Sequence, residues 1–212
     1  MPRIRKIRKI PATDEKNYFV VDACFLANKY IPQRVAPKGQ QKDRIRACVE
    51  WWKEIDRQIS NEKARVYVPD VCIAEAFKVL AKKWYVEKWF KWGAELKTAR
   101  DRLSKDISIP PKQLKKQTRR IGYHDIPTSR DIIIAVDRFF ELFMKHGFEV
   151  SLPDLIIVAT AKYLMDFYDL PRKQLHIITL DKQLWAGTKK ILELPNAYDP
   201  TEPKDSFTRI FE

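Results

Sequence analysis

The chain has 212 residues, of which 41 are Lys or Arg and 28 are Asp or Glu, so its formal net charge is +13. Hydrophobic residues make up 45% of it, too many for a disordered chain and enough for one domain with a sizeable core. No apolar run approaches the roughly 20 residues that span a bilayer, and the basic N-terminus lacks the apolar block of a secretory signal. We therefore expect a cytoplasmic protein without membrane contact, and the excess of basic residues favours a nucleic acid as partner, although it also serves solubility.

The N-terminal half of the sequence predicts a basic tail followed by alternating strands and helices. Residues 1–17 carry a crowd of basic side chains that includes Arg3 and Arg5, and residues 18–21 form a short apolar run typical of a buried parallel strand. Helices are expected at 23–30 and 43–59, where apolar residues recur at helical spacing. A second strand is expected at 66–68, and the helix after it carries Glu75.

Residues 82–130 are basic and aromatic, and we interpret them as a helical insertion. Aromatic and aliphatic residues recur there at alternating spacings of four and three from Tyr85 to Leu103, as in a heptad stripe. The stretch contributes six basic candidates for nucleic-acid binding: Lys82, Lys83, Lys115, Lys116, Arg119 and Arg120. Its Trp and Tyr side chains are candidates for base stacking, but their regular spacing favours packing against a core or a second copy more strongly, and the stripe could also seat a partner helix.

The C-terminal part predicts two capped helices, a third strand and a last helix. Thr128–Asp131 and Ser151–Asp154 both have the capping-box pattern, and an almost wholly apolar helix follows the second. A strand at 175–178 ends just before Thr179 and Asp181. Residues 18–212 thus predict a single α/β domain with a central, mainly parallel sheet flanked by helices, in which further strands near 148–150 or Tyr198 are hidden from the pattern.

Four acidic residues occupy positions where such sheets form their sites. Asp22 directly follows the first strand, Asp181 follows the third, Glu75 lies early in the helix after the second, and Asp154 lies in the first turn of the apolar helix. Each has a structural explanation as a helix cap or a first-turn acid. If the four converge on one edge, however, they need bound cations or raised pKa values, and their hard oxygen ligands suit Mg²⁺ or Mn²⁺.

The segments around these acids resemble the four acidic motifs of the PIN-domain nucleases, in the family's order. The matching residues are 18–23 with Asp22, 66–75 with Glu75, 152–161 with Asp154, and 177–181 with Thr179 and Asp181. Within the family, the chain is most similar to the ribonuclease toxins of VapBC-type toxin–antitoxin pairs and their free-standing relatives. Two departures are Cys24, where a small polar residue is frequent, and the long stretch between Glu75 and Asp154.

The resemblance implies a three-layer fold and a metal-dependent endoribonuclease. On it, Asp22, Glu75, Asp154 and Asp181 hold one or two Mg²⁺ or Mn²⁺ ions, and Thr179 is a supporting hydroxyl. Metal-assisted hydrolysis then leaves a 5′-phosphate and a 3′-hydroxyl, and the implied partners are RNA and an antitoxin or other protein. A homodimer is a further expectation, because symmetric dimers are the commonest oligomers.

Two other functions remain open from the sequence. A non-catalytic nucleic-acid-binding module on the same fold fits the charge, and Cys24 leaves room for it. A metal-dependent phosphatase or DNA nuclease is less well supported, because Asp22-Ala-Cys24 lacks the second acid of an Asp-x-Asp motif. The sequence also has no phosphate-binding G-x-x-x-x-G-K-[ST] loop, so ATP-driven chemistry is unsupported.

Overall fold

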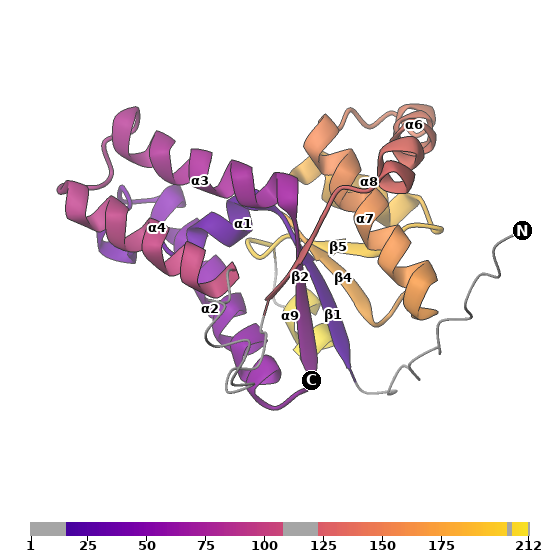
Figure 1. Ribbon diagram of the computed structural model, residues 1–212, viewed down its shortest axis with the longest axis horizontal. Helices are drawn as coiled ribbons and strands as arrows, with labels where there is room; N and C mark the ends of the chain where they lie inside the picture. The colour runs from indigo at the N-terminus through magenta and orange to yellow at the C-terminus, as the bar shows by residue number, and fades with distance from the viewer. Residues whose placement is uncertain (1–15, 108–122, 203–204, 212) are drawn as a thin grey trace, which may run out of the picture.

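Five parallel strands form the centre of the protein in a computed structural model that describes residues 16–107, 123–202 and 205–211. The strands are β1 (Asn17–Val21), β2 (Ala64–Pro69), β3 (Tyr123–Ile126), β4 (Leu175–Ile178) and β5 (Asn196–Tyr198). Their order in the sheet is β3-β2-β1-β4-β5, and every neighbouring pair is parallel (Figure 1). The chain therefore builds outward from β1 in one direction and then in the other, which places a topological switch point between β1 and β4.

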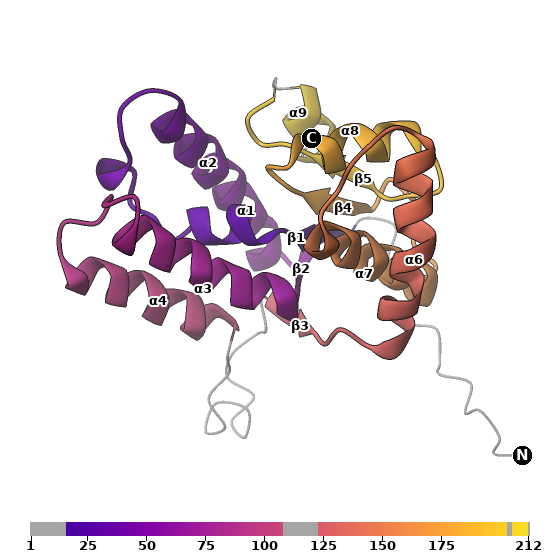
Figure 2. The same cartoon turned by 90° about the horizontal axis from the view of Figure 1, so that it is seen from above.

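Helices cover both faces of the sheet, so the predicted three-layer α/β fold is confirmed (Figure 2). The helices are α1 (Ala23–Asn28), η1 (Gln33–Val35), α2 (Gln40–Ser60), α3 (Asp70–Tyr85), α4 (Gly93–Ile107), α6 (Arg130–Lys145), α7 (Leu152–Tyr168), α8 (Lys182–Lys190) and α9 (Asp205–Phe211). On one face, Tyr18 of β1 packs against Tyr168 of α7, with ring centroids 5.9 Å apart. On the other, Phe19 packs against Phe211 of α9, which itself contacts Trp51 of α2. This alternation follows from the two-residue period of a strand.

The predicted caps form where the sequence placed them, with one shift. Ser151 accepts a hydrogen bond from the backbone of Asp154 and begins α7. At α6 the capping residue is Ser129 rather than Thr128, whose hydroxyl instead bonds the carboxylate of Asp70. Because each cap fixes the direction of its helix, Ser151 sets the point at which α7 starts and hence the position of Asp154.

The stretch 82–130 differs from the helical insertion predicted for it. Its helical stripe is interrupted, because α3 ends at Tyr85 and α4 begins only at Gly93. Its last part contains β3, which pairs with β2 and belongs to the central sheet. Residues 108–122 lie outside the described part of the chain. Of the two places suggested for hidden strands, the one at Tyr198 is confirmed as β5, whereas 148–150 is not a strand.

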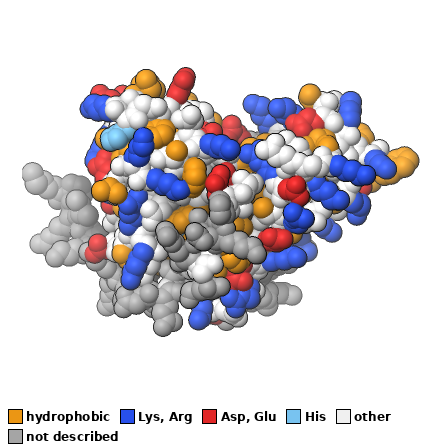
Figure 3. Space-filling view, turned by 180° about the vertical axis from the view of Figure 1, so that it is seen from behind, with side chains coloured by type: hydrophobic (Ala, Val, Ile, Leu, Met, Phe, Trp, Pro, Cys, Tyr) orange, Lys and Arg blue, Asp and Glu red, His pale blue; other side chains and the backbone are white. Residues whose placement is uncertain are grey.

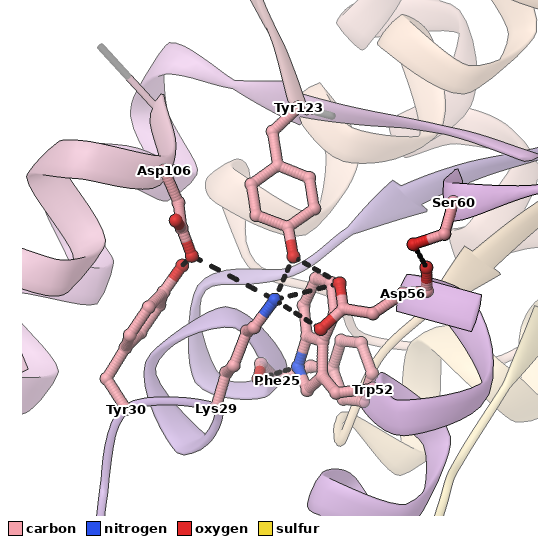
Figure 4. Close-up of polar contacts among 8 residues, drawn as sticks. All are labelled: Phe25, Lys29, Tyr30, Trp52, Asp56, Ser60, Asp106 and Tyr123. Atoms are coloured by element: carbon pink, nitrogen blue, oxygen red, sulfur yellow. Dashed lines mark hydrogen bonds and ion pairs between the residues drawn. The ribbon is translucent and has the colours of Figure 1, made fainter. Parts of the chain in front are cut away.

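A group of polar and aromatic side chains, here called the Lys29 cluster, joins four separate segments (Figure 4). The ammonium group of Lys29 lies 2.8 Å from a carboxylate oxygen of Asp56 on α2 and contacts the hydroxyl of Tyr123 on β3. It also lies 4.5 Å from the ring centroid of Trp52, and Asp106 of α4 is 3.9 Å away. The cluster therefore ties α4 and β3 to α1 and α2.

No helix within the described ranges is both long enough and apolar enough to cross a membrane. The predicted N-terminal tail, residues 1–17, lies almost wholly outside those ranges. Its last residue, Asn17, already belongs to β1, and its side-chain amide donates to the side-chain oxygen of Gln58 at 3.0 Å.

Candidate functional site

The four predicted acids, although far apart in sequence, line one pocket. Asp22, Glu75, Asp154 and Asp181 surround a space of about 220 Å³ at the carboxyl ends of β1 and β4, here called the acid pocket. Its remaining walls are Ala23, Cys24, Arg44, Ser151, Pro153, Ile157 and Leu180. The pocket thus lies at the switch point of the sheet, which is where open parallel sheets form their sites.

Asp22 is held by three hydrogen bonds and is almost completely buried. One carboxylate oxygen accepts from the backbone N–H of Phe25 at 2.6 Å, so Asp22 caps α1. The other accepts from the hydroxyl of Thr179 at 2.6 Å and from the backbone N–H of Leu180 at 2.8 Å. Burial raises the pKa of Asp22, and the hydrogen bonds oppose that rise because they favour the charged form.

Thr179 links two of the acids. Its side chain, which is fully buried, donates to Asp22 and accepts from the backbone N–H of Asp181 at 2.9 Å. Asp181 in turn caps α8, because its carboxylate accepts from the backbone N–H of Leu184 at 2.7 Å. The ends of β1 and β4 and the start of α8 are therefore joined through one hydroxyl group.

Asp154 enters the pocket from the first turn of α7. The hydroxyl of Ser151 donates to its carboxylate and accepts from its backbone N–H. Burial raises the pKa of Asp154 to about 6, and the negative charges of Asp181 and Asp22 act in the same direction against the Ser151 hydrogen bond. Burial is thus the main cause of the raised pKa, and the nearby carboxylates add to it; a bound cation would favour the charged form.

Helix capping and convergence on one pocket occur together in these acids. Asp22 and Asp181 cap their helices, and Asp154 takes part in a cap, yet all three also meet Glu75 at one pocket. Capping requires no such convergence, because α1, α7 and α8 start in different parts of the chain. Capping alone therefore does not account for the meeting of these acids at one pocket.

The side chains fit a hard divalent cation by chemistry and charge. Their oxygen donors are of the type that Mg²⁺ and Mn²⁺ prefer, and the repulsion at Asp154 supplies an electrostatic reason for a cation. Within the described residues, no three His, Cys, Asp or Glu side chains already converge closely enough to form a ready metal site. The acids surround the pocket without closing around a single point.

Arg44 and Ser151 line the pocket and were not among the predicted site residues. Ser151 was identified only as a cap, and its hydroxyl reaches Asp154 through that role. Arg44 lies in the first part of α2, and one guanidinium nitrogen donates to the backbone carbonyl of Leu180 at 3.2 Å. No local signal separates Arg44 from the other basic residues of this chain, since the contact depends on the packing of α2 against the β4–α8 turn.

Only two of the predicted nucleic-acid-binding residues lie in the described part of the chain. Arg3, Arg5, Lys115, Lys116, Arg119 and Arg120 fall outside it. Lys83 is largely buried, 2.6 Å from a carboxylate oxygen of Glu87, and its ammonium group lies over the ring of Trp89. Lys82 is exposed, 4.0 Å from Glu87, and neither lysine lines the acid pocket. Seen from behind, many other Lys and Arg side chains cover the lobe that carries α2, α3 and α4 (Figure 3).

The aromatic residues of the predicted stripe divide between core and surface. Trp89 is buried, in keeping with a packing role, while Tyr85 and Trp92 are 63% and 70% exposed. The stripe is thus not one continuous apolar face. Leu96, Ala99 and Leu103, which continue it on α4, are buried.

Comparison with known proteins shows similarity in structure only. No family model matches the sequence, and no curated protein matches it. The structure of FitAB bound to the IR36 DNA fragment is 16% identical, with a TM-score of 0.52, over 87% of this chain and 96% of that one. VapBC2 from Rickettsia felis, bound to a DNA fragment from its promoter, is 10% identical with a TM-score of 0.51, over 86% and 98%. FitAcB from Neisseria gonorrhoeae is 16% identical with a TM-score of 0.50, over 87% and 99%.

Nearly the whole length of each of these three chains aligns with this chain, so the similarity concerns the complete fold. The resemblance seen in the sequence motifs is therefore confirmed at the level of the fold. The chain has the α/β fold of the VapC-type PIN-domain proteins.

Proposed function

We propose that the chain is a metal-dependent endoribonuclease that hydrolyses RNA phosphodiester bonds in the acid pocket. The observation that carries the proposal is the meeting of Asp22, Glu75, Asp154 and Asp181, from four separate segments, around one small pocket. The fold shared with FitAB and VapBC2 supports it, because the sequence motifs resemble those of the same type of protein. The net charge of +13 supports a polyanionic substrate.

In this proposal the four carboxylates hold one or two Mg²⁺ or Mn²⁺ ions. Such an ion lowers the pKa of bound water and neutralises charge on the phosphate oxygens. Asp22 is fixed by its three donors and so keeps one orientation without rearrangement. Thr179 maintains the spacing between Asp22 and the start of α8, which places Asp181. No histidine lines the pocket, so proton transfer by imidazole plays no part in the proposal.

The partner is a further part of the proposal. The motifs resemble those of VapBC-type toxins, and VapBC2 shares the fold, so we assign the chain an antitoxin or a protein acting as one. The alternative function, a nucleic-acid-binding module without catalysis, draws support from FitAB and VapBC2, both of which were solved with DNA fragments. The two functions differ in whether bound RNA is cleaved.

A variant pair on one helix tests the proposal. Asp154→Asn removes a charge from the acid pocket, whereas Asp166→Asn makes the same change on the exposed side of α7, where Asp166 pairs with Lys162. We expect cleavage of RNA by the unaltered chain and by Asp166→Asn in Mn²⁺ or Mg²⁺, and its loss in Asp154→Asn or in excess chelator. Mn²⁺ binding, followed by calorimetry, should weaken in Asp154→Asn alone. Cleavage that persists in chelator would overturn the proposal, and metal-independent RNA binding without turnover would favour the alternative.

A further inference from the structure

A second and larger pocket adjoins the acid pocket. Its volume is about 670 Å³, and it lies between the first turns of α2 and α8 and the segment after β5. We call it the α2–α8 pocket; its walls include Gln40, Gln41, Arg44, Lys182, Thr201 and Glu202. The volume is within the range of about 300–1,000 Å³ found for small-molecule sites, and so is large enough for one nucleotide.

Arg44 is the connection between the two pockets, because its side chain lines both. Its guanidinium group donates to the carbonyl of Leu180 at 3.2 Å, and the N–H of the same residue donates to Asp22 at 2.8 Å. Leu180 therefore fixes the position of Arg44 relative to Asp22. A guanidinium group has five N–H donors, so donors remain for a ligand besides the one that holds Leu180.

The lining of the α2–α8 pocket is polar and carries both charges. Arg46 and Asp43 form an ion pair with a 3.0 Å separation, which neutralises two of the charged groups on α2. Lys182 and Arg44 remain on the basic side, against Glu50 and Glu202 on the acidic side. Amide, hydroxyl and carboxylate groups of this kind hydrogen-bond to base edges and to ribose hydroxyls, while an arginine binds phosphate.

We propose that the α2–α8 pocket binds the nucleotide next to the scissile phosphate of an unpaired RNA strand, and that Arg44 binds the phosphate between them. This inference rests on the proposed ribonuclease function. The acid pocket repels phosphate, so a cation at its border is needed to hold the strand there. A base enters a recess of this kind only when it is not paired, so the substrate is single-stranded at the cut.

Arg44→Ala and Arg44→Lys test the role of the arginine, with Arg57→Ala as the matched control. Arg57 lies at the other end of α2, where it pairs with Glu54 on the surface. With a single-stranded oligoribonucleotide that the unaltered chain cleaves, we expect KM to rise about tenfold or more in Arg44→Ala. The slope of log KM against log salt should decrease by about 0.7–0.9, the value expected for the loss of one phosphate contact. Arg44→Lys keeps the charge, so it should keep the slope of the unaltered chain while binding more weakly. Arg57→Ala should change neither.

Binding is measured separately in the cleavage-deficient Asp154→Asn background, by fluorescence anisotropy of the same oligoribonucleotide. Adding Arg44→Ala should weaken binding about tenfold or more. In a chain that keeps Arg44, an abasic site on one side of the cut should also weaken binding. In a chain with Arg44→Ala, the same abasic site should have no further effect. Unchanged KM and binding in Arg44→Ala, or indifference to abasic sites on both sides, would overturn the subsite. Absence of cleavage by the unaltered chain would instead overturn the proposed function on which it rests.

Discussion

Replacing Thr179 by valine tests the link between the carboxyl ends of β1 and β4. The substitution keeps the shape of a fully buried side chain and removes only its hydroxyl. Two hydrogen bonds disappear: the one donated to Asp22 at 2.6 Å and the one accepted from the N–H of Asp181 at 2.9 Å. Thr188→Val is the matched control, because Thr188 is also fully buried and loses one donated and one accepted bond, both with backbone groups.

The two substitutions should differ in their effect on the free energy of unfolding. A hydrogen bond to a charged group contributes about 1.5–3 kcal/mol, and a buried N–H left without an acceptor costs about 1 kcal/mol or more. We therefore expect Thr179→Val to lower the free energy of unfolding by about 3 kcal/mol. The bonds of Thr188 are neutral and longer, at 3.1 Å each, so its loss should be about 1–2 kcal/mol.

The difference should also depend on pH. Burial already raises the pKa of Asp22 in the folded state, and the Thr179 hydroxyl opposes that rise, so Thr179→Val raises the pKa further. Between the unfolded and folded pKa values, the folded state binds more protons, and its stability therefore falls as pH rises. Because this window extends to higher pH in Thr179→Val, its deficit relative to the unaltered chain should grow with pH. The deficit of Thr188→Val should stay constant.

Urea unfolding followed by circular dichroism measures both effects. The unaltered chain and the two variants are compared in EDTA at several pH values between 5 and 8, so that bound metal does not contribute to stability. Equal losses for the two threonines, or a loss at Thr179 below about 1 kcal/mol without pH dependence, would refute the described role of this hydroxyl.

Three further predictions concern the rest of the fold. Burial lowers the pKa of His176 to about 3, whereas the unfolded chain protonates this residue near pH 6.5. The free energy of unfolding should therefore fall as pH drops from 6.5 towards 3, and be about 2 kcal/mol lower at pH 5 than at pH 8. In thermal unfolding, His176→Phe should remove this part of the pH dependence. Gly187→Ala should cost about 1–3 kcal/mol by urea unfolding, because the added carbon would lie 2.8 Å from Cδ1 of the fully buried Phe143. Lys29→Met should cost about 1–3 kcal/mol in the same assay, since it leaves Asp56 without its cation, and the half-exposure of Asp56 keeps the loss below that of a deeply buried pair.

The strands that the sequence predicted are those with continuous apolar character. Residues 18–21, 66–68 and 175–178 form the three middle strands of the sheet, which are buried on both faces and are apolar apart from His176. β3 and β5 lie at the two edges and include polar residues such as His124, Asp125 and Asn196. Edge strands need less apolar surface, so β3 has no continuous apolar run that would mark it as a strand. For this reason its residues were assigned to a helical insertion.

Three of the four acids of the candidate site, Asp22, Asp154 and Asp181, occupy positions that follow from a local rule. Asp22 and Asp181 come just after apolar strands, and parallel strands bring their carboxyl ends to one edge. Asp154 follows from the capping pattern at Ser151. The sequence did not determine how closely these side chains approach one another, since that depends on the angle at which α7 packs on the sheet.

The Lys29 cluster shows most clearly what the sequence could not supply. Lys29 is one basic residue among 41, and its partners Asp56, Asp106 and Tyr123 lie 27 to 94 positions away. Their combination brings α4 and β3 against the C-terminal end of α1, the helix that Asp22 caps, so the stretch between the second and third acids packs onto an element that positions one of them. That stretch is consequently part of the framework of the site, and not a separate module added to it.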